Sequence, residues 1–287
     1  MRKLLLIGLL LTAALSARAQ VDLEKEFFSL PDTVTNAYLD SLTIEVAAPN
    51  DYWMAGAYGG ASVQFGFWNP SRYTTGHWAG PVYGVSFIRY YTMFGIFHNM
   101  GLEMGAQMNY EGYEFKFNKE TGYRATESGA YKVTMKVPEA YFLSHFHVDM
   151  GEHFKLLAKL GIYGGYRMSI SRTMDDDYAP YETYQQYVNS FRDYDRRWTY
   201  GVQGGVGFGL MFSPVEFHVN VQVKWGWESF WEPDYASPYY YRFAYPLDGA
   251  ITFGMYYQLT PRYGHTRSQL KKLARKMVQQ QIEQKND

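Results

Sequence analysis

The segment from Val215 to Phe230 alternates apolar and polar residues. Its odd positions up to Trp227 are apolar, and its even positions up to Glu228 are polar or glycine. Alternation with a period of two predicts a β-strand with one apolar and one polar face. The run is much longer than the five or six residues usual for a strand in a globular protein. The pattern therefore indicates a fold built from long, two-faced strands.

Seven other stretches show the same pattern. They cover approximately residues 53–68, 82–94, 100–117, 131–150, 154–170, 197–212 and 247–259. The stretch at 82–94 alternates poorly, and the one at 131–150 changes phase at Pro138. A β-bulge would explain both irregularities, because proline inside a strand belongs at an edge or a bulge. We therefore expect eight strands, two of them bulged.

Short and long connections alternate between these strands. The short ones are the regions around residues 95–98, 151–153 and 213–214, and the long ones are 69–81, 118–130, 171–196 and 229–246. Outer-membrane barrels have this rhythm, with short periplasmic turns and long external loops. The sequence thus predicts an all-β fold, an eight-stranded antiparallel up-and-down transmembrane β-barrel, in the cell outer membrane. Both termini are expected in the periplasm and the long loops outside the cell.

A soluble barrel with its apolar face inward, as in lipocalins, is the alternative. Two features favour the membrane barrel. Most strand glycines lie on the polar face, which suits a narrow interior. Bulky aromatic residues such as Trp68, Trp198 and Trp225 lie near strand ends, where the membrane interfaces would be.

The regions outside the strands complete the predicted organisation. Residues 1–19 have a basic start, an apolar run and Ala17-Arg18-Ala19, the pattern of a cleaved signal peptide. Residues 20–51 form a periplasmic lead-in, 52–260 the barrel, and 261–287 a basic periplasmic tail that includes a short helix. The chain has no cysteine and a formal net charge of -1. Disulfides and thiolate metal sites are therefore excluded, and no nucleic-acid partner is expected.

Several glycine-rich motifs resemble a known family. They are AGAYGGASVQFGF in the first strand, KVPEAYFLSHFHV in the fourth, LGIYGGYRMS in the fifth, and GVQGGVGFGLMF followed by VEFHVNVQVKWGW. Over about Trp53 to Leu259, the chain resembles the PorT-like outer-membrane β-barrel family of Bacteroidota. The resemblance implies an eight-stranded outer-membrane barrel. Some members of the family serve the type 9 secretion and gliding machinery, and most have no assigned role.

The polar faces of the predicted strands place many charges in the lumen. The expected set is Glu103, Glu111, Glu139, Lys155, Lys159, Arg167, Arg197, Glu216, Lys224, Glu228 and Asp248. Buried charges must be paired to be tolerated, and the two signs are nearly balanced. The set therefore predicts a salt-bridge plug that closes the barrel, whereas a selective channel would carry an excess of one sign.

The SHFHVD motif at residues 144–149 raises the question of chemistry. Two histidines and Asp149 could bind zinc, and Ser144 beside His145 could support acyl transfer. However, Ser144 is expected on the opposite face from His145. We therefore expect no catalytic residues, no metal site and no cofactor. The acidic MDDDY segment also lacks the spaced ligands of an EF-hand loop.

The tail after the last strand carries a partial apolar stripe beside basic residues. The residues concerned are Leu270, Lys271, Lys272, Leu273, Arg275, Lys276 and Met277. They form either a solvated tail or a helix that docks on a partner or on lipid headgroups. The expected function is a non-enzymatic barrel, an accessory or structural component of an envelope or secretion assembly. The expected partners are outer-membrane lipid and other envelope proteins. A surface adhesin or ligand-binding barrel using the tyrosine-rich loops is the alternative, followed by a barrel enzyme acting on lipid.

Overall fold

The computed structural model describes most of the predicted barrel. The described residues are 51–69, 71, 74–78, 80–93, 97–120, 122–150, 153–177, 180, 182–232 and 243–260. The predicted signal peptide, the lead-in up to residue 50 and the basic tail from residue 261 lie outside the described residues. Nothing in the structure therefore tests those predictions.

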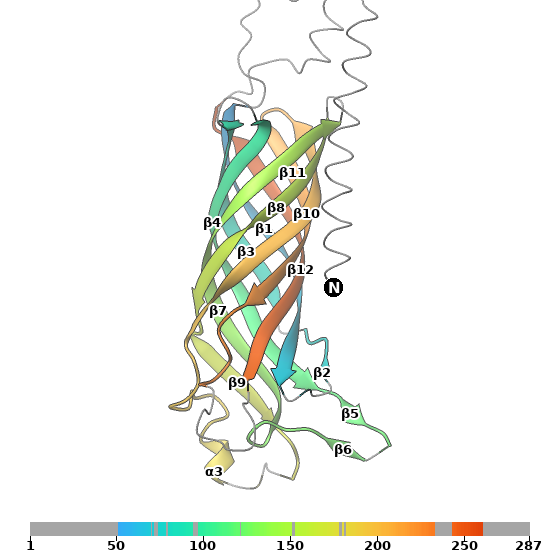
Figure 1. Cartoon of the computed structure of the whole chain (residues 1–287), viewed down its shortest axis with the longest axis vertical. Helices are drawn as coiled ribbons and strands as arrows, with labels where there is room; N and C mark the ends of the chain where they lie inside the picture. Colours follow the sequence, from blue (N-terminus) through green and yellow to red (C-terminus); the bar gives the residue numbers. More distant parts are fainter. Residues whose placement is uncertain are drawn as a thin grey trace, which may run out of the picture. The chain divides into compact units, whose positions relative to one another are not determined.

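Eight long strands form a closed antiparallel barrel (Figure 1). They are β1 (Tyr52–Asn69), β3 (Pro81–Met93), β4 (Phe97–Phe115), β7 (Ala130–Met150), β8 (Phe154–Tyr166), β10 (Trp198–Phe212), β11 (Val215–Gly226) and β12 (Phe243–Gln258). Each pairs with the next in this order, and β12 pairs with β1 to close the ring. This confirms the predicted up-and-down barrel and its alternating connection lengths. Closure leaves no unpaired strand edge around the ring.

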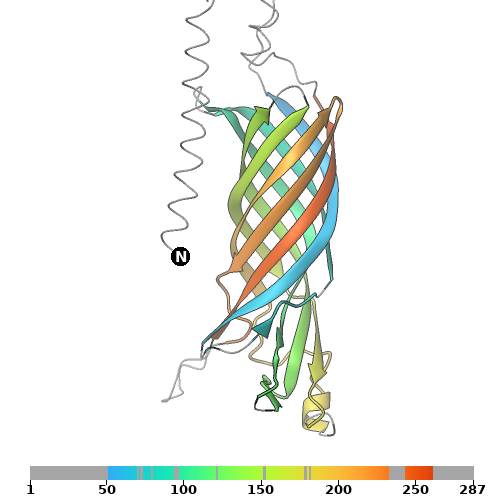
Figure 2. The same cartoon turned by 90° about the vertical axis from the view of Figure 1, so that its right-hand side faces the viewer.

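Shorter elements extend the barrel at the end that carries the long connections, here called the loop end. They are β2 (Thr74–Thr75), β5 (Phe117–Asn118), β6 (Tyr123–Arg124), β9 (Ser169–Met174) and α3 (Glu182–Gln185). The β5–β6 hairpin projects away from the barrel at this end (Figure 2). The opposite end carries the three short turns and is called the turn end.

The barrel is polar inside and apolar outside. In β11 the polar residues at even positions are buried, and the side chains at odd positions become exposed along the strand: Val221 is 50% exposed and Gln222 is 9% exposed. A soluble barrel has the opposite polarity, because water would cover its outer face. An apolar outer wall is what a bilayer requires, so the fold is that of a transmembrane β-barrel.

The apolar wall is banded along the barrel axis. Aliphatic side chains such as Val206, Val221 and Ile251 are exposed at mid-height, where they are paired across β10, β11 and β12. Exposed aromatic side chains lie toward both ends of the strands, as Phe67 and Trp198 do at the loop end and Phe212 and Tyr257 at the turn end. This order matches the aromatic girdle at a membrane interface. Among the described residues, no helix has the length and apolarity needed to cross a membrane.

The predicted bulge at Pro138 is wrong. The β4–β7 register runs without a shift through Met108 opposite Pro138, and Val133, Val137 and Glu139 all point inward. The inward and outward alternation of β7 continues through Pro138, but the environment that the inward side chains meet changes there. Toward the loop end the interior becomes apolar, so inward side chains there are apolar rather than charged.

The weak alternation of β3 has a similar cause. Val82, Ile88 and Tyr90 are buried on the inward face between small or polar residues. The register shift in this pairing is confined to the strand end, between Tyr91 and Met93. The second predicted bulge therefore explains only that end of the strand.

A continuous apolar cluster, here called the loop-end core, lies inside the barrel between the charged region and the loop end. Its buried members are Trp68, Tyr113, Phe115, Ala130, Val133, Met135, Val137, Ile170, Met174, Phe230, Trp231 and Ala244. Trp68 contacts Tyr113 edge-on, with ring centroids 4.7 Å apart. Outside the membrane, apolar side chains gain by facing inward, so the polarity of the strands reverses here.

Candidate functional site in the barrel lumen

The described lumen holds nine of the eleven predicted charged residues. They are Glu103, Glu111, Glu139, Lys155, Lys159, Arg167, Glu216, Lys224 and Asp248, each at most 6% exposed. They come from β4, β7, β8, β11 and β12, and from the segment just after β8. The strands present these side chains inward because each occupies the same alternate phase of its own strand. The set contains five carboxylates and four cations.

Arg197 and Glu228 do not belong to this buried set. Arg197 is half-buried, and its Nε donates to the Arg167 carbonyl at 3.0 Å while its guanidinium stacks on Phe191 at 4.0 Å. Glu228 pairs with the exposed Arg196 at 3.2 Å. Both residues lie beyond the ends of their strands, where alternation no longer fixes which way a side chain points. The prediction that they lie in the lumen is therefore corrected to the loop-end rim.

Glu216 is the centre of the cluster nearest the turn end. Its carboxylate accepts hydrogen bonds from Tyr52 Oη at 2.7 Å, Lys155 Nζ at 2.9 Å and Gln258 Nε2 at 2.9 Å. Its Oε2 also lies 3.1 Å from His218 Nε2. Lys155 additionally donates to Tyr52 Oη. Four neighbours thus hold one carboxylate, which is the condition for keeping a charge away from water.

A second cluster lies beside the first. Lys159 Nζ lies 2.7 Å from Glu103 Oε2. His145 Nδ1 lies 3.8 Å from the same carboxylate oxygen and 3.2 Å from Tyr90 Oη. Aromatic and polar side chains thus contact one another inside the lumen at this level.

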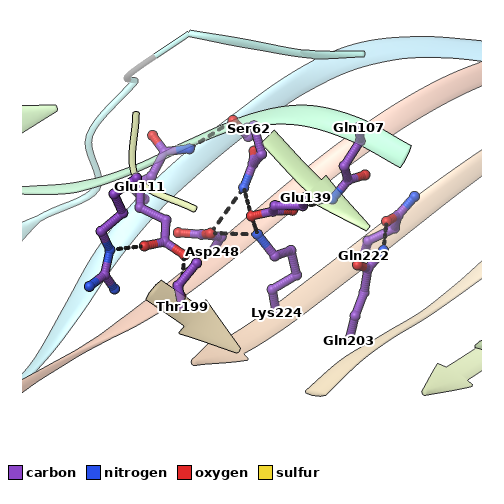
Figure 3. Close-up of polar contacts among 12 residues, drawn as sticks. Ser62, Gln107, Glu111, Glu139, Thr199, Gln203, Gln222, Lys224 and Asp248 are labelled. Atoms are coloured by element: carbon purple, nitrogen blue, oxygen red, sulfur yellow. Dashed lines mark hydrogen bonds and ion pairs between the residues drawn. The ribbon is translucent and has the colours of Figure 1, made fainter. Parts of the chain in front are cut away.

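Lys224 joins two carboxylates in the third cluster (Figure 3). It donates to Glu139, and its Nζ lies 3.3 Å from Asp248 Oδ2. Gln107 Nε2 donates to Glu139 at 2.6 Å, and Asn109 Nδ2 donates to Asp248 at 3.2 Å. Because one ammonium faces two acids, the side-chain amides supply the remaining donors.

Arg167 and Glu111 form the charged cluster nearest the loop end. Arg167 Nε donates to Glu111 Oε2 at 2.8 Å, and Thr199 Oγ1 donates to Oε1 at 2.9 Å. Arg167 Nη1 also donates to the carbonyls of Arg196 and Ser229. The guanidinium thereby ties the connections after β8 and β11 to the barrel wall.

Sequence reasoning did not identify the uncharged partners. Gln203 Nε2 donates to Gln222 at 2.6 Å (Figure 3). Gln222 in turn donates to Thr252 at 3.1 Å. Tyr58 Oη donates to Gln107 Oε1 at 2.7 Å. The available signal was position, since all of these residues occupy the inward phase of their strands. The buried Arg172–Asp195 pair at 2.5 Å, near the loop-end core, was also missed because Asp195 lies in a long connection.

The SHFHVD motif does not assemble a reactive site. His145 and His147 point into the lumen, whereas Ser144 lies on the other phase of β7, so Ser144 and His145 do not form a nucleophile–base pair. His147 Nδ1 lies 3.5 Å from Asp149 Oδ1. Across the part of the chain that the structure describes, no group of three or more His, Cys, Asp or Glu side chains is arranged to hold a metal ion.

The charged side chains of the lumen are arranged as ion pairs. Each of the nine charges has an opposite charge within ion-pair distance. Buried side chains from all eight strands line the lumen between the turn end and the loop-end core, and the cavity within that core holds about 10 Å³. Such an arrangement would oppose the passage of ions, since an ion entering it would have to break a buried pair.

Several solved outer-membrane barrels resemble the chain. OprG from Pseudomonas aeruginosa is 12% identical, with a TM-score of 0.39 over 75% of this chain and 99% of OprG. Ail of Yersinia pestis, solved with the heparin analogue sucrose octasulfate, is 10% identical, with a TM-score of 0.34 over 72% of this chain and 99% of Ail. The outer membrane protease OmpT from Escherichia coli is 8% identical, with a TM-score of 0.35 over 77% of this chain and 100% of OmpT.

A likeness this distant carries no information about the function of this chain. No protein-family model and no curated protein matches the sequence.

Proposed function

We propose that this chain is a non-enzymatic barrel of the outer membrane that serves as a closed, structural or accessory component of an envelope assembly. The observation that carries the proposal is the lumen, in which buried charges such as Lys224, Glu139 and Asp248 are paired with one another. The apolar outer wall supports a place in a membrane. A barrel that conducts nothing acts through its surfaces, which is why we favour an accessory role.

The proposed orientation puts the turn end in the periplasm and the loop end outside the cell. Its support is the asymmetry of the connections. The short turns after β3, β7 and β10 lie at one end with the start of β1 and the end of β12. Outer-membrane barrels carry their short turns on the periplasmic side. The resemblance to the PorT-like family extends this proposal to a secretion assembly reached through the periplasmic tail.

One observation favours a second candidate, a surface adhesin or ligand-binding barrel. The β5–β6 hairpin exposes Phe117 and Tyr123, and Trp78 is exposed at the same end of the barrel. Exposed aromatic side chains in a projecting hairpin are suited to contact with glycans or protein. This candidate places the partner outside the cell, whereas the accessory role places it in the periplasm.

The closed lumen is tested by planar-bilayer recording of the purified full chain. The native protein should give no steady, porin-like current. The triple variant Glu139→Ala, Lys224→Ala, Asp248→Ala removes one whole cluster without leaving an unpaired charge, and it should conduct more than the native barrel. A steady current through the native protein would contradict the proposal.

The two candidate roles are separated by co-purification from mild detergent. A barrel lacking residues 261–287 and a barrel lacking the hairpin at 117–124 are compared with the full chain. An accessory role predicts that periplasmic partners are lost only when the tail is removed. An adhesin predicts that loss of the hairpin abolishes surface binding while removal of the tail has no effect.

A further inference from the structure

The outer wall of the barrel contains an apolar groove. It has a volume of about 630 Å³ and runs over β1, β3, β4 and β7. Its lining includes the small residues Ala55 on β1 and Ala140 on β7 and the bulkier Phe87 on β3 and Met104 on β4. In the strand register Ala55 is opposite Phe87, and Phe87 is opposite Met104, so these side chains form one row across the wall. The groove is a depression in a surface that otherwise presents bulky apolar side chains to the bilayer.

A cation lies on the same wall, on the turn-end side of the groove lining. Arg89 is opposite Trp53 in the register, two residues toward the turn end from Phe87 and Ala55. Its guanidinium lies 4.5 Å from the centroid of the Trp53 ring, and Nη2 lies 2.5 Å from Asp51 Oδ1. On the outward face of the eight described barrel strands, Arg89 is the only lysine or arginine in the turn-end half.

We propose that the groove and Arg89 together bind one phospholipid of the leaflet at the turn end. An acyl chain lies along the groove, and the phosphate meets the Arg89 guanidinium. The proposal rests on the proposed membrane location. In a bilayer the groove faces hydrocarbon, and leaving it empty would forfeit the contacts of its lining. Tryptophan beside arginine is the pairing expected at headgroup level, since the indole is amphipathic and the guanidinium matches a phosphate.

Asp51 forms an ion pair with Arg89, so its carboxylate competes with a lipid phosphate for the guanidinium. Its side chain is 44% exposed. An exposed ion pair contributes little, because water and salt screen it. A lipid phosphate can therefore replace this carboxylate. An anionic headgroup is preferred over a zwitterionic one, because it has no ammonium group of its own to compete with Arg89 for the phosphate.

The experiment uses the full chain folded into phosphatidylcholine vesicles that contain increasing amounts of phosphatidylglycerol. Native mass spectrometry counts bound lipid, and gel mobility of unheated samples reports folding. The native barrel should retain one phosphatidylglycerol. Arg89→Gln should weaken its binding about fivefold, the upper range for an exposed charge pair. Ala140→Trp should remove the retained lipid by filling the groove, whereas Val221→Trp, on β11 outside the groove, should leave it unchanged.

Asp51→Asn is a second, independent variant, because it removes the competitor without touching the groove. It should tighten phosphatidylglycerol binding. Unchanged binding in Arg89→Gln or in Asp51→Asn would overturn the proposal. A dimer that disappears in Ala140→Trp would also overturn it, because a second copy would then occupy the groove. A chain that fails to fold into any vesicle would instead contradict the membrane barrel itself, so the two failures are distinguishable.

Discussion

Lys155 Nζ lies 2.9 Å from Glu216 Oε2, and both side chains are fully buried. The two residues come from β8 and β11, which do not pair with each other because β10 lies between them in the sheet. The ion pair therefore bridges over β10 on the inner face of the curved wall. Tyr52 contacts both partners from β1, which links three separate parts of the ring.

Lys155→Met should strongly destabilise the barrel. It leaves Glu216 as a buried carboxylate without its cation, and breaking a buried pair in this way costs about 3–5 kcal/mol. The double variant Lys155→Met, Glu216→Gln should lose less than the sum of the single losses, because no unpaired charge remains. The measurement is the free energy of unfolding by urea in lipid vesicles.

The matched control is the Arg196–Glu228 pair at the loop-end rim, whose Arg196 side chain is exposed. Arg196→Ala should cost less than about 1 kcal/mol, as is usual for an exposed pair. Equal losses for Lys155→Met and Arg196→Ala would argue against a buried, closed lumen.

Val221→Arg should destabilise the barrel by an amount that depends on how deep Val221 lies in the bilayer. Val221 lies at mid-strand, opposite Val206 and Ile251 in the apolar band. An outward arginine there should cost about 2–4 kcal/mol, falling to about 0–1 kcal/mol near an interface. Phe67→Arg, at the loop end of β1, is the comparison. The measurement is reversible unfolding in vesicles of different thickness. A penalty that is equal at both positions would rule out lipid contact as its source.

Protease accessibility should report the orientation. Asp176 lies in the long connection after β9. A cleavable tag placed beside it should be cut on intact cells, whereas a tag after Asn286 should be protected until the outer membrane is opened. Cleavage of only the C-terminal tag on intact cells would reverse the proposed topology.

Low pH should reduce the local stability of the segment around His77. Burial lowers the pKa of His77, as does the nearby Lys132, while Glu114 at 3.3 Å opposes them. The folded state therefore favours the neutral ring. The stability that this ring contributes is fully present above its ordinary pKa of about 6.5 and is lost as the pH falls through the lowered value.

Hydrogen exchange at residues 74–78 should consequently rise from about pH 7.5 to about pH 5, after correction for intrinsic rates. The variant His77→Gln keeps a side chain able to reach Thr134, which lies 2.9 Å from the native ring. Its protection should not change over that interval. The same acid response in this variant would assign the effect to other groups.

The alternation of residues was enough to predict strand number, strand direction and the facing of most side chains. The segment from Val215 to Trp225 illustrates this, since each residue falls on its predicted face. Alternation did not predict the environment that each face meets. Val133 and Glu139 lie on the same inward face of β7, but one packs in the loop-end core and the other joins Lys224. The change at Pro138 therefore looked like a bulge.

The sequence by itself determined that this chain forms a barrel with charges inside, because the pleat of a β-strand converts a period of two directly into two faces. Only the tertiary structure decided which charges meet. Lys155 reaches Glu216 on the next strand but one because its neighbour on β10 is Gly209, which has no side chain to intervene, and because the curvature of the wall turns the inward side chains of β8 and β11 toward each other. Arg197 and Glu228 were assigned to the lumen wrongly because Arg197 lies just before β10 and Glu228 just after β11, in connections whose residues follow no period.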